Sequence, residues 1–324
     1  MRAAVVDRYG PPEVVTVAEV PRPRAGPGQV LVRVQATPVT AGDARIRGAH
    51  FPPGFGPPAR LAFGIRGPRR RILGGTFAGV VEAVGDGVDG FAPGVAVCGM
   101  TGTKLGTHAE LVVVPSDRVT AIPSGVSTDD AAGVLFGGTA ALYFLRDKAS
   151  VAPGRSVLVN GASGAVGTNA VQLAKHFGAR VTAVTSGANA GLVTSLGADA
   201  VIDHTHGGLA TTDQRFDVVL DCVGNLTISS GRRLLNEGGV LVLAVANLWD
   251  TVRARRDVVA GAAPERVEDF QLLLGLVASG ELTVVHDSAY SLDGIVEAHR
   301  RVDTGHKRGN VIVRPCLDAE EEGS

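Results

Sequence analysis

The sequence feature that most constrains the fold is a glycine-spaced turn, VLVNGASGAVG, at residues 157–167. A short apolar run leads into this turn and ends at Asn160, and glycines stand at positions 161, 164 and 167. The run that follows, AVGTNAVQLAKHF, carries apolar residues at helical spacing, and RVTAVT comes after it as a strand-like run. The order strand, glycine turn, helix and strand predicts one βαβ unit of a parallel sheet.

The same alternation extends from about residue 124 to residue 287. Strand-like runs such as AVID, FDVVLD and VLVLAVA are separated by stretches with helical periodicity. This pattern predicts a doubly wound parallel sheet with helices packed against it. The chain has 324 residues, which exceeds the usual size of one hydrophobic core, so a second domain is expected.

The remainder of the chain has a different pattern. Residues 1–123 contain short alternating runs divided by proline and glycine, which is typical of an antiparallel barrel or sandwich. Beyond residue 288 a helix and a strand precede an acidic tail, LDAEEEGS, which is expected to be frayed. Residues 51–71 are rich in proline, glycine and arginine, and they predict a loop or lid. Its arginines are expected to be solvated rather than to face an acidic ligand.

Composition and charge limit the class of partner. Hydrophobic residues make up 45% of the chain and charged residues 19%, with a formal net charge of -1. These values predict a soluble globular protein without general affinity for nucleic acid or membrane. The N-terminal run lacks a signal-peptide core, and no apolar run is long enough to span a bilayer. The three cysteines, Cys98, Cys222 and Cys316, show neither disulfide nor metal-site spacing, which favours a reduced, cytoplasmic protein.

The glycine turn is suited to hold the pyrophosphate of a dinucleotide. Gly161 permits a tight turn, Gly164 lets the backbone approach the anion, and Gly167 allows the helix to pack closely on the strand. The helix N-terminus adds a positive field, and Ser163 offers a hydroxyl donor. The sequence therefore predicts a dinucleotide site at the carboxyl edge of the parallel sheet.

The end of the second strand bears on the choice between NAD and NADP. An NAD site usually has an acidic residue there, about 20 residues after the glycines. Here the strand ends in VTAVTSGAN, and no acid occurs before Asp199. Ser186 and Asn189 can donate hydrogen bonds to a 2′-phosphate, so NADPH is the expected cofactor. Arg215 is the only Lys or Arg between residues 181 and 231, so the preference over NADH could be modest.

Several motifs resemble the medium-chain dehydrogenase/reductase superfamily, in its zinc-free quinone oxidoreductase (zeta-crystallin-like) branch. They are AGVVEAVG, FGGTAALYFLRDKASVAPGRSVLVNGASGAVGTNAVQLAKHFGA, SLGADAVID and AHRRVDTGHKRGNVIV, in this order over nearly the whole chain. The resemblance implies a GroES-like, mainly antiparallel catalytic domain formed by residues 1–123 and 288–324. A Rossmann dinucleotide-binding domain, residues 124–287, would be inserted between these two parts, with the cofactor in the cleft.

The resemblance also implies cofactor contacts at individual residues. Thr139 matches a threonine near the nicotinamide, Ser186 matches the position that contacts the 2′-phosphate, and Asn189 stands where many relatives have lysine. Loops after two later strands would flank the nicotinamide ribose, and the turn HKRGNV would fold back onto the cofactor. The residues so implied are Thr139, Gly161, Ser163, Gly164, Ala165, Val166, Gly167, Ser186, Asn189, Val223, Gly224, Ala246, Asn247, Lys307 and Asn310.

The chain departs from the zinc enzymes of the superfamily. Those enzymes carry a cysteine near the segment ATPVTAGDARIRG and a Gly-His-Glu where this chain has GGTFAG, and neither ligand is present here. No metal site of that type is therefore expected. Without a Lewis acid a simple alcohol is hard to oxidise, whereas a conjugated acceptor takes a hydride more readily. The expected activity is NADPH-dependent reduction of a quinone or an α,β-unsaturated carbonyl compound.

Three side chains are candidates for a catalytic role in proton donation. Thr40 and Asp43 lie in the segment that matches the substrate-facing turn of the family, and Tyr143 lies on the helix before the dinucleotide-binding domain. Asp43 equally suits the cap of the following helical turn, and Tyr143 also suits a core position. Water can take the place of a dedicated acid in related enzymes.

Two other functions remain possible on the same scaffold. One is a pathway-specific enzyme, either a carbonyl or enoyl reductase or a non-redox cyclase or isomerase. The other is a non-catalytic NADPH-binding protein. A homodimer is also implied by the resemblance, with VLVLAVANL as either an apolar sheet edge or a buried central strand.

Overall fold

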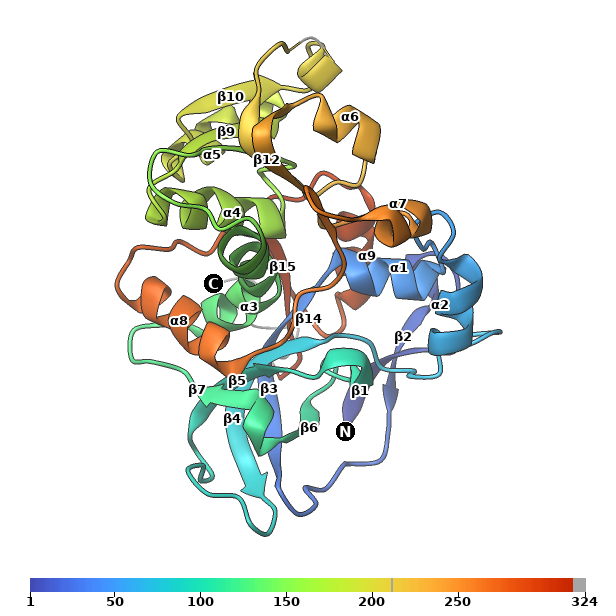
Figure 1. The fold of residues 1–324 in the computed structure, drawn as a ribbon. Helices are drawn as coiled ribbons and strands as arrows, with labels where there is room; N and C mark the ends of the chain where they lie inside the picture. Colours follow the sequence, from blue (N-terminus) through green and yellow to red (C-terminus); the bar gives the residue numbers. More distant parts are fainter. Residues whose placement is uncertain (211, 317–324) are drawn as a thin grey trace.

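The computed structural model describes residues 1–210 and 212–316. The acidic tail LDAEEEGS lies outside the described residues. Two large sheets and a small two-stranded sheet form the molecule, with helices around them (Figure 1). Among the described residues, no helix has the length and apolar character that a membrane crossing requires.

A six-stranded parallel sheet occupies the middle of the chain, which confirms the predicted doubly wound architecture. Its strand order is β10-β9-β8-β11-β12-β13, and every neighbouring pair is parallel. The strands are β8 (Ser156–Asn160), β9 (Arg180–Thr185), β10 (Ala200–Asp203), β11 (Phe216–Asp221), β12 (Leu235–Leu243) and β13 (Val258–Ala260). The stretch VLVLAVANL supplies part of β12, which lies between β11 and β13, so its interpretation as a sheet edge is wrong.

Helices cover both faces of this sheet. Val157 and Val159 of β8 pack in one core with α3, α4 and α8, whereas Leu158 packs in a separate core with the residues around α6. Successive strand residues point to opposite faces, and burial of both faces explains why the strands are apolar throughout. The helices are α3 (Thr128–Leu142), α4 (Ala165–His176), α5 (Ala190–Ser195), α6 (Ile228–Arg232), α7 (Leu248–Arg253) and α8 (Val267–Ala278).

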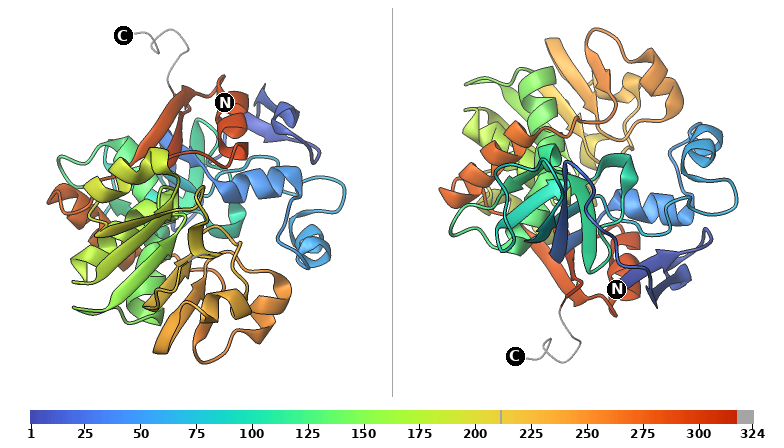
Figure 2. Two further views of the ribbon diagram at one scale, coloured as in Figure 1. Left: turned by 90° about the horizontal axis from the view of Figure 1, so that it is seen from above. Right: turned by 90° about the horizontal axis from the view of Figure 1, so that it is seen from below.

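The second large sheet combines both ends of the chain. Its order is β14-β15-β3-β4-β5-β7, with β6 paired to β3, and all pairs are antiparallel except β14 with β15. The small sheet pairs β1 with β2, and α9 contacts β2, so the first strands of the chain lie side by side with a helix from near the end of the described residues (Figure 2). The elements are β1 (Arg2–Val6), β2 (Val15–Glu19), β3 (Gln29–Val39), α1 (Ala41–Gly48), α2 (Gly56–Phe63), β4 (Thr76–Val84), β5 (Ala96–Met100), β6 (Leu111–Pro115), β7 (Val119–Ala121), β14 (His286–Ser291), α9 (Ile295–Asp303) and β15 (Asn310–Arg314).

The segment 51–71, predicted as a loop or lid, contains a helix. Prolines at the first positions of α2 suit a helix start, because the N–H groups missing there have no partner within a helix. The backbone N–H of Leu248 donates to the carbonyl of Pro53 at 3.0 Å, so this segment lies against the start of α7. Its arginines are exposed, and Arg71 pairs with Asp7, which agrees with a solvated basic surface.

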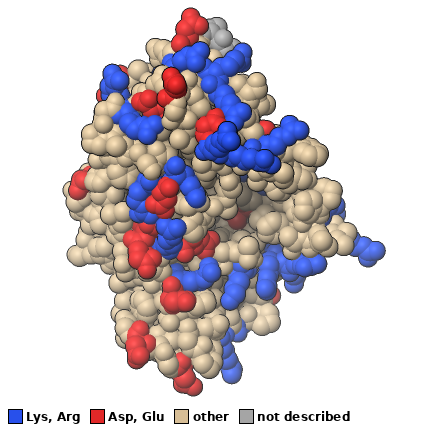
Figure 3. Space-filling view, viewed as in Figure 1, with Lys and Arg blue, Asp and Glu red and all other residues tan. Residues whose placement is uncertain are grey.

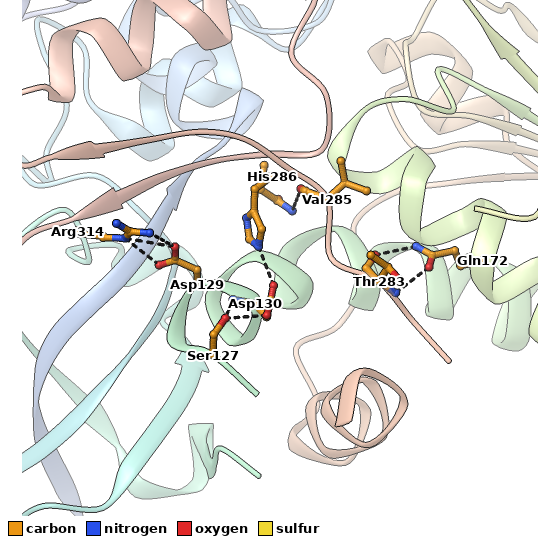
Figure 4. A network of polar contacts seen from close by, with 9 residues as sticks. Ser127, Asp129, Asp130, Gln172, Thr283, Val285, His286 and Arg314 are labelled. Atoms are coloured by element: carbon orange, nitrogen blue, oxygen red, sulfur yellow. Dashed lines mark hydrogen bonds and ion pairs between the residues drawn. The ribbon is translucent and has the colours of Figure 1, made fainter. Parts of the chain in front are cut away.

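Polar contacts fasten the two large sheets to each other (Figure 4). In the first turn of α3, Asp129 binds Arg314 of β15 at 2.6 Å and Asp130 binds His286 of β14 at 2.7 Å. The side-chain amide of Gln172 on α4 makes two hydrogen bonds with the backbone of Thr283, where the chain leaves the parallel sheet. The domain limits at residues 124 and 288 stay a prediction, and β14 begins two residues before the second limit.

Candidate active site

A cavity of about 1080 Å³ lies at the carboxyl ends of β8, β9 and β11. Its wall also includes residues of β3, α1, α3 and the turn after α9, so both large sheets contribute to it. Ligands of doubly wound sheets bind at this edge. Of the fifteen predicted cofactor contacts, eleven line the cavity: Gly161, Ser163, Gly164, Ala165, Val166, Gly167, Ser186, Asn189, Val223, Lys307 and Asn310.

The glycine turn between β8 and α4 has distinct geometry at each glycine. Gly161 has φ 81°, a left-handed conformation that favours glycine. A Cβ on Gly167 would lie 2.1 Å from the carbonyl oxygen of Gly161, so a side chain there would force α4 away from the strand. A Cβ on Gly164 would lie 3.6 Å from its nearest neighbour, the carbonyl oxygen of Gly161, and Gly164 lines the cavity. The backbone at Gly164 is therefore accessible to a ligand.

The N-terminus of α4, residues Ala165 to Gly167, lines this cavity. Gly164 is the N-cap residue, and no side chain caps the helix. The hydroxyl of Ser163 accepts hydrogen bonds from Thr185 Oγ1 at 3.0 Å and Asn189 Nδ2 at 3.2 Å, which leaves its own proton for a further partner. These groups form a site for an anion, since helix N-termini carry partial positive charge.

The turn between α9 and β15 closes over the glycine turn. The backbone N–H of Gly309 donates to the carbonyl of Ser163 at 2.8 Å. Lys307 lines the cavity, and its Nζ donates to the carbonyl of Gly309. Burial lowers the pKa of Lys307 to about 8, because the charged amine is removed from water. Asn310 Nδ2 donates to the carbonyl of Val285 at 3.1 Å, so its side chain fixes the turn.

A pair of polar residues at adjacent strand ends was missed by the sequence reasoning. Asp221, fully buried at the end of β11, accepts hydrogen bonds from the N–H groups of Val223, Gly224 and Leu226. It also accepts from Asn160 Nδ2 at 2.9 Å, at the end of β8. Together they shape the loop after β11 that lines the cavity. The sequence does show that each of them is a polar residue at the end of an apolar strand, and this position could have identified them.

The residues of the cavity wall bear on the choice of dinucleotide. Ser186 and Asn189 line the wall after β9 and His204 lines it after β10, whereas Arg215 and Arg233 line it from positions just before β11 and β12. An acid that the sequence reasoning did not place here also comes close. Strand pairing sets Asp203 opposite Thr185, and a Cβ on Gly187 would lie 2.7 Å from the Asp203 carboxylate.

The Asp203 carboxylate is directed toward its own loop and does not line the cavity. It accepts hydrogen bonds from the backbone and hydroxyl of Thr205 and contacts His206, and these contacts lower its pKa to about 2. The Asp203 carboxylate therefore lies beside the end of β9 without forming part of the cavity wall.

The three candidate catalytic residues have different surroundings. Thr40 lines the cavity, but its hydroxyl donates to Asp43 Oδ2 at 2.6 Å, and a hydroxyl has only one proton to give. Asp43 is buried and also accepts from the N–H groups of Thr40 and Gly74. The Thr40–Asp43 pair forms the capping box of α1, which agrees with the alternative of a helix cap rather than a proton donor.

Tyr143 and four predicted cofactor contacts do not line the cavity. Tyr143 begins a π-helical segment, Tyr143–Lys148, about two turns beyond Phe136, the residue of α3 that does line it. Its ring packs against Phe144, as the alternative of a core position implies, and its catalytic role stays a prediction. Thr139 is buried and donates to the carbonyl of Leu135 at 2.7 Å. The others are Gly224, Ala246 and Asn247, the last of which is the N-cap of α7.

Metal ligands and a reactive thiol are the remaining possibilities for chemistry at the cavity. Within residues 1–210 and 212–316, no group of three or more His, Cys, Asp or Glu side chains could hold a metal ion. Cys222 lines the cavity, but burial raises the pKa of its thiol, which disfavours the nucleophilic thiolate. Neither feature supplies a catalytic group.

Comparison with known proteins agrees with the geometry. Two family models match: alcohol dehydrogenase GroES-like domain over residues 26–124 and zinc-binding dehydrogenase over residues 196–313. The chloroplastic quinone oxidoreductase QR1 of Triphysaria versicolor is 29% identical over 97% of this chain and 98% of its own length. The 2-methylene-furan-3-one reductase of Solanum lycopersicum is 31% identical over 97% of this chain and 79% of its own length.

Solved structures show the same relationship. The quinone oxidoreductase from Coxiella burnetii has a TM-score of 0.86 at 27% identity, covering 97% of this chain and 99% of that one. A mycobacterial protein solved in complex with NADPH has a TM-score of 0.81 at 25% identity, covering 97% and 100%. The chain is thus an oxidoreductase that belongs to the medium-chain dehydrogenase/reductase superfamily, as its motifs predicted.

Proposed function

We propose that this protein is an NADPH-dependent reductase of quinones or α,β-unsaturated carbonyl compounds that works without a metal. The observation that carries the proposal is the uncapped N-terminus of α4, which opens into a cavity large enough for a dinucleotide. Gly161, Gly164, Ser163 and Lys307 would hold the pyrophosphate there. NADPH supplies a hydride to the acceptor when it is bound.

The preference for NADPH over NADH rests on charge. Ser186 and Asn189 follow β9 without an acidic residue, and Arg215 and Arg233 add positive charge elsewhere on the cavity wall. A 2′-phosphate carries negative charge that these arginines would attract. The NADPH complex of the mycobacterial relative supports the same choice.

The choice of acceptor rests on the cavity wall formed by β3 and α3. Val39 and Phe136 offer an apolar surface, and the described residues bring together no set of metal ligands. A conjugated acceptor suits such a site, because its developing charge spreads over the carbonyl without a Lewis acid. The names of the quinone oxidoreductase and furanone reductase relatives support this class.

A substrate panel tests the proposal. Purified protein is expected to oxidise NADPH faster than NADH with 1,4-naphthoquinone or 4-phenyl-3-buten-2-one, and dialysis against a chelator is expected to leave the rate unchanged. Loss of activity on chelation, or no oxidation with any quinone or enone, would overturn it. We also propose that the protein is a homodimer in the cytoplasm. Light scattering coupled to gel filtration measures its oligomeric state.

A further inference from the structure

Arg45 stands out among the charged residues of the cavity. It lies in the middle of α1, half-buried, and its side chain contributes to the cavity wall. Within the described residues its guanidinium makes no hydrogen bond or ion pair. Arg47, two residues later on the same helix, binds Asp303 at 2.5 Å and donates to the carbonyl of Gly10. The contrast indicates that Arg47 serves the fold, whereas Arg45 has no structural partner.

The position of Arg45 separates it from the groups expected to hold the cofactor phosphates. α1 follows β3, a strand of the second large sheet, and Arg45 shares its part of the wall with Val39, Thr40 and Ala41. The glycine turn belongs to the parallel sheet. The α4 N-terminus, the Ser163 hydroxyl and Lys307 lie beside it and would already bind the phosphates. Arg45 is therefore a cation beyond those that a pyrophosphate requires.

Half-burial of an arginine without a counter-charge costs free energy. Burial lowers the pKa of Arg45, yet a guanidinium stays protonated at any physiological pH, so the charge persists. Asp213 is the one carboxylate among the described lining residues, and it is exposed on the loop before β11. An oxyanion that enters the cavity would give Arg45 the partner that the described part of the chain does not provide.

We propose that Arg45 binds a carboxylate carried by the hydride acceptor, so that the preferred substrates are anionic enones or quinones. This inference rests on the proposed function. The planar guanidinium offers paired N–H donors that match a carboxylate, and Val39 and Phe136 offer apolar surface for the conjugated part of the same molecule. A neutral quinone would leave the guanidinium without a partner.

A matched pair of acceptors tests the proposal. 4-(4-carboxyphenyl)but-3-en-2-one and its carboxamide have nearly the same shape and differ by one negative charge far from the enone. The wild-type enzyme is expected to prefer the carboxylate by about 10- to 100-fold in kcat/KM, the range of a charged hydrogen bond. Arg45→Met is expected to remove this preference and to leave the Kd of NADPH within about twofold. Arg24→Met removes an exposed positive charge outside the cavity and is expected to keep the preference.

A second readout keeps this test separate from the proposed function. Calorimetry of the two compounds with the enzyme–NADP⁺ complex measures the preference without turnover. If neither acceptor is reduced but the carboxylate binds more tightly through Arg45, the proposed reaction fails and the Arg45 site stands. Equal binding of the two compounds overturns the inference. The inference is also overturned if Arg45→Met raises the Kd of NADPH and lowers kcat/KM with both acceptors by the same factor, because Arg45 would then be a cofactor contact.

Discussion

The backbone N–H of Gly309 donates a hydrogen bond to the carbonyl oxygen of Ser163, 2.8 Å away. This contact joins the turn before β15, a strand of the second large sheet, to the glycine turn of the parallel sheet, and so sets one wall of the cavity against the other. Figure 3 shows the hollow on this face, with Lys and Arg side chains gathered around it. A second, smaller cavity of about 460 Å³ is lined by Arg232, Arg253, Arg255 and Arg256.

Gly309→Ala is expected to weaken NADPH binding by at least about tenfold. Gly309 has φ 60°, and a Cβ there would lie 2.1 Å from the carbonyl oxygen of Val285, so the turn must move away from Ser163. Fluorescence titration with NADPH measures the change. Gly280→Ala is the control, since Gly280 lies outside the cavity and has φ 76° but open space around a Cβ, and it adds only backbone strain of about 1 kcal/mol. Equal Kd values for the two variants would contradict the role given to Gly309.

Gly167→Ala is expected to lower both stability and NADPH affinity. The added methyl group would meet the carbonyl of Gly161 and the Cα of Ala162, which are backbone atoms that cannot rotate aside. We expect a loss of about 2 kcal/mol in the free energy of unfolding, typical of overpacking. Urea unfolding measures it, and Gly191→Ala in α5, where a Cβ meets nothing, is expected to be neutral or slightly stabilising. An unchanged midpoint for Gly167→Ala would refute the close packing.

NADPH affinity is expected to depend on pH through Lys307. Burial places its pKa at about 8, so the amine is charged below that pH and neutral above it. A bound phosphate stabilises the charged form, and the Kd should therefore be constant below pH 7 and rise above pH 8, approaching tenfold per pH unit. Titrations between pH 6.5 and 9.5 measure this profile.

Lys307→Arg is the matched control for that profile. A guanidinium stays protonated over the whole range, so the variant is expected to bind NADPH with a flat profile between pH 7 and 9.5. If the wild-type enzyme and Lys307→Arg give the same profile, Lys307 does not contact the phosphates.

Asp221→Asn is expected to destabilise the protein by about 3 kcal/mol. The buried carboxylate accepts three hydrogen bonds at Oδ1 and one at Oδ2 from the N–H of Leu226. In the amide, the NH2 group that replaces one oxygen would face an N–H donor in place of accepting from it. Urea unfolding of this variant is compared with Asp117→Asn, a change at an exposed position that should leave the midpoint near wild type. A loss below about 0.5 kcal/mol would show that Asp221 does not organise its loop.

Local patterns were sufficient to predict the parallel sheet and the cavity at its edge. The glycine turn, its strand and its helix are contiguous in sequence, and each element is specified by its own periodicity. The position of β12 was not predictable in the same way. β13 has only three residues, Val258–Ala260, too few for a visible pattern, and its presence turns an apparent sheet edge into an internal strand.

The site residues also divide into those that a local pattern predicts and those that depend on contacts in the folded chain. Asp203 lies beside Gly187 only because β10 pairs with β9 in one register, which no local pattern reveals. Whether Tyr143 reaches a ligand depends on the packing of α3, and this residue lies beyond Phe136, the α3 residue that lines the cavity, at the start of a π-helical segment. The sequence did not single out Arg45, because only the folded chain shows that its guanidinium has no partner among the described residues.

Hydride transfer from NADPH to a conjugated acceptor is the central claim, and isotope transfer tests it most directly. NADPH deuterated at the reactive C4 position is incubated with the enzyme and 4-phenyl-3-buten-2-one, and the product is examined by mass spectrometry and NMR. We expect one saturated ketone for each NADPH oxidised, with deuterium at the β-carbon. A product without deuterium, or bound NADPH that is never oxidised, would contradict the claim.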